Sequence, residues 1–347
     1  MYIKRAIERL LKEALEQFPV CLITGPRQAG KSTLLQNYLK SYSYVTLDDP
    51  MHRAMANQDP ELFLTSFPAP LIIDEIQYAP NLFSYIKIKV DQNRRKTGQY
   101  VLTGSQVFQL MKGVSESLAG RIAIFQLYPL SWTEIVDGRM VPFHECIKQT
   151  VQGFYPEFFV VPHLNWDLWY GSYLSTYIER DVRNIKSITD LGRFQTFVKL
   201  LAIRAGQLLN LSELAKECGI SQPTAKDWVS ILEATYIIKL LHPYHNNLSK
   251  RLVKTPKVFF VDTGLLCYLL GIDTEERFAK VAERGHIFEN MVIMEVIKRL
   301  SHQTERSQVY FYRTASQVEV DLIIERGNSL EAYEIKYAKT LDRGMTN

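Results

Sequence analysis

A glycine-rich segment near the N-terminus constrains the fold of this chain more than any other stretch. Residues 25–32 read Gly-Pro-Arg-Gln-Ala-Gly-Lys-Ser and match the pattern G-x-x-x-x-G-K-[ST]. The apolar run 20–23 before them predicts a buried strand, and residues 32–39 after them predict the first turns of a helix. A strand, a glycine loop and a helix in this order form the context that a phosphate-binding P-loop requires.

The residues of this loop have the chemistry of a nucleotide site. Backbone N–H groups at a helix N-terminus attract anions, and Gly25 and Gly30 let that backbone approach a phosphate closely. Lys31 would contact the β- and γ-phosphates, and Ser32, followed by Thr33, would place a hydroxyl on Mg²⁺. We therefore expect ATP and Mg²⁺ as cofactors. The alternative, an ordinary glycine turn, fits this context poorly.

An apolar strand that ends in two acids follows after one further strand–helix unit. Residues 71–73 are Leu-Ile-Ile, and Asp74 and Glu75 come directly after them. A carboxylate at the carboxyl end of such a strand can reach Mg²⁺, which suits Asp74. Glu75 then suits the base that orients or deprotonates the attacking water. Two solvated acids in a loop are the alternative, which fits poorly after an apolar run.

Arg121 is a candidate for stabilising charge on the γ-phosphate. It stands on a glycine turn, Leu-Ala-Gly-Arg, that leads into a strand predicted at 122–125. An arginine at such a place can act as a finger in its own chain or in a neighbouring chain, and the second case would require a homo-oligomer. A surface arginine is the alternative.

These segments resemble a prokaryotic family of AAA-type ATPases whose C-terminal domain has no characterised function. The resemblance lies in 25–28, 71–77, 102–105 and 118–121, and it continues in 130–134, 177–182 and 256–265. It implies an α/β domain with a parallel sheet of P-loop NTPase type. In AAA-type ATPases a polar residue at the tip of the strand after the acidic pair senses the γ-phosphate, which makes Ser105 a candidate. A plain strand-to-helix turn is the alternative for Ser105.

Length and composition indicate several globular domains. The 347 residues are 46% hydrophobic and 22% charged, and the formal net charge of +4 permits a nucleic-acid partner without requiring one. The four cysteines lie far apart, as in a cytoplasmic protein with reduced thiols. No apolar run approaches the ~18 residues of a membrane span. We predict four parts: an ATPase domain at 1–138, a helical connector or lid at 139–189, a winged-helix domain at 190–275 and a truncated nuclease-like domain at 276–347.

The connector ends in a helix predicted at 166–184 that carries five aromatic residues on one face. They are Trp166, Trp169, Tyr170, Tyr173 and Tyr177. Such a stripe can stack on nucleic-acid bases, but it is more often part of a core, and core packing is our interpretation.

The segment 211–233 predicts a helix-turn-helix. Ser212 is expected to cap its first helix, Gly219 to form the turn and Ser221 to cap the second helix. The apolar runs 237–241 and 257–261 would then pair as a wing.

A winged helix of this kind can bind DNA. Gln222, Thr224 and Lys226 would then project from the recognition helix toward base edges. Arg251 and Lys257, at the wing, would meet phosphates. A protein-interaction module or an ATPase lid is the alternative.

The C-terminal segment resembles the PD-(D/E)xK nuclease core. Glu289 opens a predicted helix, Asp321 lies within an apolar strand, and Glu334 and Lys336 form an E-x-K pair on another strand. The resemblance implies that the acids hold Mg²⁺ and that the lysine positions or activates water. An acid inside an apolar strand is also costly to bury without a partner or a metal. The printed sequence ends at Asn347, soon after Lys336, so an active nuclease and a degenerate domain that only binds both stay open.

Together these features predict Mg²⁺-dependent ATP hydrolysis that switches or powers engagement of DNA or of a protein partner. A nucleotide-dependent protein-interaction switch with little turnover is one alternative. An ATP-regulated, metal-dependent nuclease is the other.

Overall fold

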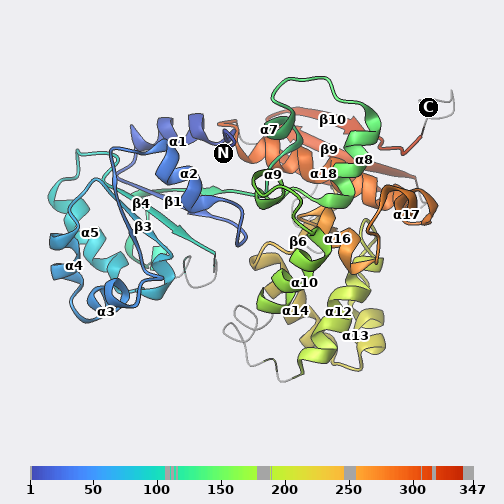
Figure 1. The fold of residues 1–347 in the computed structure, drawn as a ribbon, viewed down its shortest axis with the longest axis horizontal. Helices are drawn as coiled ribbons and strands as arrows, with labels where there is room; N and C mark the ends of the chain where they lie inside the picture. Colours follow the sequence, from blue (N-terminus) through green and yellow to red (C-terminus); the bar gives the residue numbers. More distant parts are fainter. Residues whose placement is uncertain are drawn as a thin grey trace. The chain divides into compact units, whose positions relative to one another are not determined.

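The computed structural model describes most of the chain. The described residues are 2–105, 110, 113–114, 116–177, 188, 190–245, 255–305, 307–314 and 318–338. They form two compact units, which span 1–130 and 131–347 (Figure 1). The finer boundaries at 138, 189 and 275 stay predictions. None of the described helices is both long enough and apolar enough to cross a membrane.

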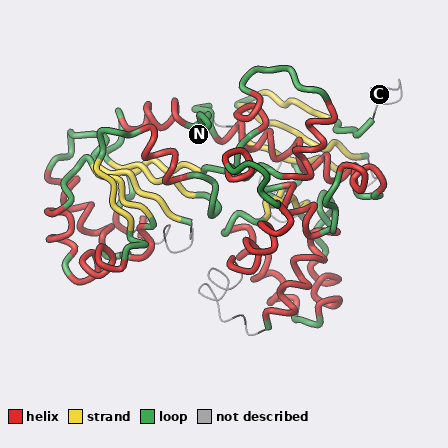
Figure 2. The backbone as a smooth tube through the Cα atoms, in the orientation of Figure 1, coloured by secondary structure: helices red, strands yellow, loops and turns green. Residues whose placement is uncertain are grey.

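A five-stranded parallel sheet forms the centre of the first unit (Figure 2). Its strands, in spatial order, are β2 (Ser43–Thr46), β3 (Leu71–Asp74), β4 (Tyr100–Gly104), β1 (Val20–Thr24) and β5 (Ile122–Gln126). β4 lies between β1 and β3 and pairs in parallel with both. This sheet confirms the predicted α/β fold of P-loop NTPase type. It also brings the carboxyl ends of β1, β3 and β4 together at one edge, where ligands bind in such folds.

Helices cover both faces of the sheet. α1 (Glu8–Leu15) and α2 (Lys31–Tyr38) pack on one face. α3 (Pro50–Gln58), α4 (Pro60–Ser66) and α5 (Leu82–Gln92) pack on the other. Along β1, Val20 and Leu22 face the second group, whereas Cys21 and Ile23 face the first. A strand covered on both faces has no solvent side, which is why the sequence of β1 is continuously apolar.

The second unit begins with helices around one hydrophobic core. They are α8 (Phe143–Gln152), α9 (Glu157–Val160), α10 (Trp166–Tyr177), α12 (Leu191–Ile203), α13 (Leu211–Cys218), α14 (Gln222–Ala234), α16 (Thr263–Leu269) and α17 (Glu275–Lys280), and α7 (Trp132–Val136) precedes them in the chain. The tyrosines Tyr170, Tyr173 and Tyr177 of α10 are buried in this core. Trp169 stacks on Tyr173 with ring centroids 5.1 Å apart. The prediction of core packing for this stripe is confirmed.

The helix-turn-helix has the predicted helices but a different first cap. Asn210, not Ser212, caps α13, because its side chain accepts a hydrogen bond from the Glu213 N–H. Ser221 caps α14 as predicted. β6 (Ile238–Leu241) and β7 (Lys257–Phe260) pair antiparallel, so the two predicted strands do meet.

A long helix and a three-stranded antiparallel sheet complete the second unit. They are α18 (Arg284–Ser301) and the strands β8 (Ser307–Arg313), β9 (Glu319–Arg326) and β10 (Ser329–Tyr333), with β9 in the centre. The Asn290 side chain of α18 accepts from the Phe260 N–H at 2.7 Å and donates to the Phe260 carbonyl at 2.8 Å. This double hydrogen bond fastens α18 to β7.

Candidate functional site

The P-loop connects β1 to α2 and depends on its glycines. Gly25 has a φ of 151° and Gly30 a φ of 88°, conformations that other residues rarely adopt. A Cβ on Gly25 would lie 2.1 Å from the carbonyl oxygen of Leu127. Gly30 is the N-cap residue of α2, and having no side chain it cannot accept a hydrogen bond from the first N–H groups of the helix. The N–H groups in the first turn of α2 are therefore suited to an anion.

Two basic side chains hold this loop. Lys31 is buried, and its Nζ donates to the carbonyl oxygens of Gly25 at 3.0 Å and Pro26 at 2.8 Å. Arg5, which precedes α1, is also buried. Its guanidinium donates to the carbonyl oxygens of Ala29 at 2.8 Å and Tyr128 at 2.7 Å. Arg5 thus joins the loop to the segment after β5, a contact that sequence reasoning missed.

Three hydroxyl groups surround the Asp74 carboxylate at the end of β3. Ser32 Oγ lies 2.8 Å and Tyr44 Oη 2.6 Å from Asp74 Oδ2, and Thr103 donates to Oδ1. Burial, together with the hydrogen bond to Asp74, raises the pKa of the Tyr44 phenol. The structure therefore brings together Ser32 and Asp74, the two predicted magnesium ligands. Their oxygen atoms suit Mg²⁺, which takes one or two protein ligands beside phosphates and water.

Glu75 follows Asp74 in a left-handed backbone conformation, with a φ of 59°. Its N–H donates to Thr103 Oγ1 at 3.3 Å, and its carboxylate accepts a hydrogen bond from the Gln77 side chain. Ser105, just past the end of β4, is buried, and its hydroxyl has no partner among the described residues. The last paired residues of the parallel strands β1 and β4 are Thr24 and Gly104. The residues that follow them, Gly25 and Ser105, therefore lie at the same edge of the sheet.

Arg121 lies at the opposite edge of the sheet from the P-loop. Its carbonyl accepts from the Val20 N–H at the start of β1, whereas the P-loop begins after the end of β1. Its guanidinium forms an ion pair with Asp91 at 2.7 Å. This pairing raises the pKa of Arg121 and lowers that of Asp91. Of the two possibilities for Arg121, the structure does not support action on its own chain, because the length of β1 separates Arg121 from the P-loop. Action on a neighbouring chain stays a prediction.

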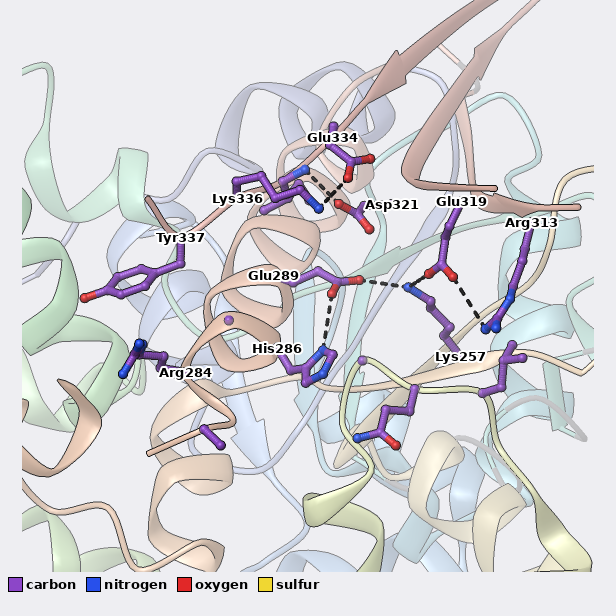
Figure 3. A pocket seen from close by; sticks show the side chains of 16 residues that line it. Lys257, Arg284, His286, Glu289, Arg313, Glu319, Asp321, Glu334, Lys336 and Tyr337 are labelled. Carbon is purple, nitrogen blue, oxygen red and sulfur yellow. Dashed lines mark hydrogen bonds and ion pairs between the residues drawn. The ribbon is translucent and has the colours of Figure 1, made fainter. Parts of the chain in front are cut away.

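A second site lies in the other unit. A pocket of about 760 Å³ is lined by all four predicted nuclease-like residues, Glu289, Asp321, Glu334 and Lys336 (Figure 3). They come from α18, from β9 and from the segment after β10. Asp321 accepts from the Ile335 N–H at 2.8 Å. Burial raises the pKa of the Asp321 carboxyl, and the charges of Glu289 and Glu334 raise it further.

Lys257 of β7 occupies the centre of the charges in this pocket, between Glu289 and Glu319 (Figure 3). Its ammonium lies 3.1 Å from the Glu289 carboxylate and also pairs with Glu319. Burial disfavours the charged form, but these two carboxylates raise the pKa of Lys257 above its ordinary value. The predicted contact between Lys257 and a DNA phosphate is therefore wrong, because the side chain is buried and already neutralised.

Two further contacts between titratable groups lie in the pocket. His286 Nδ1 lies 3.7 Å from Glu289 Oε2, and this contact raises the pKa of the imidazole. Lys336 Nζ lies 2.5 Å from Glu334 Oε1. Among the residues that the structure describes, no group of three or more His, Cys, Asp or Glu side chains has a metal-binding arrangement. The pocket thus gathers the predicted residues but pairs two of its acids, Glu289 and Glu334, with Lys257 and Lys336.

The predicted DNA-contact residues lie partly outside the described chain. Gln222 and Lys226 of α14 are exposed. Thr224 is half-buried and tied to the Ser221 cap. Arg251 lies outside the described residues. Its role stays a prediction.

Sequence reasoning missed Tyr44, Thr103 and Gln77 around the acidic pair. Thr103 and Gln77 carry a weak signal, because each is a polar residue at or just after the end of an apolar run. The sequence signal at Lys257 is misleading, because a lysine at the start of a predicted wing strand suggests an exposed charge.

Three family models match successive parts of the chain. A family described as an AAA domain matches residues 17–136. Two domains of unknown function follow, DUF8612 at 144–276 and DUF4143 at 284–346. The AAA match agrees with the predicted ATPase family, and the other two matches name no function.

Relatives span nearly the whole chain. The uncharacterized proteins Mb2031c of Mycobacterium bovis and Rv2008c of Mycobacterium tuberculosis are each 30% identical over 332 residues, which are 95% of this chain and 73% of the relative. Among solved structures, the Walker-type ATPase paby2304 of Pyrococcus abyssi has a TM-score of 0.53 and 16% identity, covering 78% of this chain and 96% of that one. This similarity supports the P-loop NTPase fold.

Proposed function

Because the chain belongs to the family of the two mycobacterial proteins and carries an AAA domain at 17–136, we propose that it binds ATP with Mg²⁺ and hydrolyses it. We propose further that the cycle switches or powers engagement of DNA or of a protein partner, in the cytoplasm. One observation carries the ATPase proposal. Lys31 and Ser32 of the loop and the Asp74 carboxylate meet at the carboxyl edge of one parallel sheet.

Each residue of this edge has a separate task in the proposed reaction. The N–H groups after Gly25 and Gly30 bind phosphate oxygens, and Lys31 leaves its loop carbonyls to contact the β- and γ-phosphates. Ser32 and Asp74 hold Mg²⁺, which would neutralise charge on these phosphates when bound. Thr33 adds a hydroxyl near the phosphates.

The residues after β3 and β4 act on the attacking water and on the γ-phosphate. Glu75 takes a proton from that water, and Ser105 contacts the γ-phosphate. Arg121, if it acts, does so on the nucleotide of a neighbouring chain in a homo-oligomer.

Two variants test the ATPase proposal. Lys31→Ala is expected to abolish ATP binding and turnover, because the loop loses its phosphate-binding cation. Glu75→Gln is expected to keep ATP binding and to lower the hydrolysis rate by roughly 10²- to 10⁴-fold, because the base is lost. Binding is measured with a fluorescent ATP analogue and turnover by phosphate release. A wild type that neither binds nor hydrolyses ATP contradicts the proposal. Tight binding with turnover that Glu75→Gln leaves unchanged favours a switch with little turnover.

DNA and protein partners can be distinguished by salt dependence. Exposed Lys226 of the second helix would contact DNA, whereas exposed Lys216 on α13 serves as a matched control. We expect duplex DNA affinity that falls with salt and falls further in Lys226→Ala, with little change in Lys216→Ala. The absence of salt-sensitive DNA binding in the wild type would leave a protein partner as the supported alternative.

A metal-dependent nuclease is a second candidate function. The observation that favours it is the convergence of Glu289, Asp321, Glu334 and Lys336 on one pocket (Figure 3). We expect plasmid cleavage with Mg²⁺ or Mn²⁺ to be lost in Asp321→Ala and kept in Glu331→Gln, which changes an acid on β10 outside the pocket lining. Cleavage that survives Asp321→Ala would remove Asp321 from the site.

A further inference from the structure

Two buried polar atoms just after the ends of β3 and β4 have no hydrogen-bond partner among the described residues. They are Gln77 Oε1 and Ser105 Oγ. Gln77 is only 4% exposed and Ser105 only 5%. Leaving such atoms unpaired costs free energy, so a site that keeps two of them is suited to a polar ligand.

Gln77 reaches this position by a sharp turn of the chain. Glu75 has left-handed backbone angles and is followed by the 3₁₀ turn η1 (Ile76–Tyr78), which carries Gln77 back against the end of β4. Gln77 Oε1 lies close to Gly104, since a Cβ there would be 2.4 Å from it. The carboxamide therefore lies against the backbone immediately before Ser105.

The two ends of this carboxamide have different environments. Its N–H group donates to the Glu75 carboxylate, whereas its oxygen lies against Gly104 and has no donor within the described part of the chain. A carboxamide can do both because it carries a donor and an acceptor, and a carboxylate at this position could not donate at neutral pH.

We propose that Gln77 is a positioning residue of the ATPase site: it orients the Glu75 carboxylate and, with Ser105, provides the second hydrogen-bonding position for the attacking water. This inference rests on the proposed ATP hydrolysis. In that reaction the water oxygen bonds to the γ-phosphorus while the bond from the γ-phosphorus to the β–γ bridging oxygen breaks, and its electron pair stays on ADP. The water gives one proton to Glu75, which passes it to the released phosphate. The second O–H of the water donates to Gln77 Oε1 or Ser105 Oγ.

The main test is the variant Gln77→Met, which keeps the side-chain length and removes both polar atoms. We expect the hydrolysis rate to fall roughly tenfold to a hundredfold, because the base and water lose their orientation, while the Kd for ATP stays within about twofold. If Gln77→Met fails to fold, Gln77→Glu takes its place, because it keeps the shape of the side chain and loses the donor. It is expected to show the same fall in hydrolysis rate with the same small change in the Kd for ATP.

A matched control is Gln99→Met, since Gln99 is equally buried in the same unit but lies at the start of β4. Its side chain donates to the carbonyl oxygen of Lys96 at 2.8 Å. We expect this variant to lower thermal stability and to leave turnover per folded molecule unchanged. If the role of Gln77 were purely structural, Gln77→Met would behave like Gln99→Met, with lower thermal stability and unchanged turnover per folded molecule.

A double-mutant cycle completes the test. In a Glu75→Gln background, Gln77→Met is expected to cause a smaller loss of rate than in the wild type, because only the contact of Gln77 with the water is left to lose. A wild type that hydrolyses ATP combined with an unchanged rate in Gln77→Met and Gln77→Glu overturns the inference and leaves the proposed function standing. Additive losses in the double variant also overturn it. Absence of hydrolysis in the wild type overturns the proposed function itself.

Discussion

Lys257 neutralises two carboxylates in a pocket built from three separate parts of the second unit. The ammonium comes from β7, Glu289 from α18 and Glu319 from β9. Arg313 supports Glu319 from its other side, at 3.5 Å. A buried charge is tolerated only when it is paired and hydrogen-bonded, so each member of this group depends on the others.

Replacing Lys257 with Met is expected to destabilise the second unit by about 3 kcal/mol or more, because Glu289 would be left buried without its cation. The free energy of unfolding in urea measures this effect. Lys336→Met is the matched control, since its ion pair with Glu334 is half exposed and is expected to change stability by less than about 1 kcal/mol. Equal stability of the two variants would show that Lys257 does not balance the pocket.

At the scale of elements, α16 depends on a single buried carboxylate. Asp262 caps this helix by accepting from the Leu265 N–H at 3.0 Å. It also accepts from the Phe154 N–H at 2.7 Å and from the Tyr170 hydroxyl at 2.5 Å. Burial raises the pKa of Asp262, although these three donors oppose the shift. One side chain therefore joins α16 to α10 and to the segment after α8.

Asp262→Ala is expected to cost about 3 kcal/mol or more in the second unit, because three buried donors lose one acceptor. Asp190→Ala is the matched control, since Asp190 caps α12 by one exposed hydrogen bond, and a cost of about 1 kcal/mol is expected. Urea unfolding followed by circular dichroism gives both values. A loss in Asp262→Ala no larger than that of the control would contradict the proposed link between helices.

At the scale of the whole molecule, the chain folds around separate hydrophobic cores. Two clusters cover the faces of the parallel sheet in the first unit, and another cluster holds the helices of the second unit. The P-loop and the charged pocket of Lys257 therefore belong to different cores.

We expect calorimetry to show two unfolding transitions, of which ATP with Mg²⁺ raises only the one that belongs to the first unit. At a ligand concentration 100 times the Kd, binding adds about 2.7 kcal/mol to that unit. Lys31→Ala should abolish the shift and leave the other transition in place. One cooperative transition that moves as a whole would contradict the separation of the cores.

The sequence by itself determined the features that depend on neighbours along the chain. Apolar strands before the P-loop and before Asp74 predicted the α/β fold, because a strand buried on both faces must be continuously apolar. The helix-turn-helix and the paired strands β6 and β7 followed from caps and periodicity in the same way. Asp321 was found because a charge inside an apolar strand needs a partner.

Only the tertiary structure decided which distant residues meet. Arg121 precedes β5 and the P-loop follows β1. Because these two strands pair in parallel, the start of β5 and the end of β1 lie at opposite edges of the sheet, which separates Arg121 from the P-loop. The tertiary structure also brings Gln77 against Gly104, and it places Lys257 between Glu289 and Glu319. Such contacts arise from packing between elements far apart in the chain, and the local pattern of apolar and polar residues does not predict that packing.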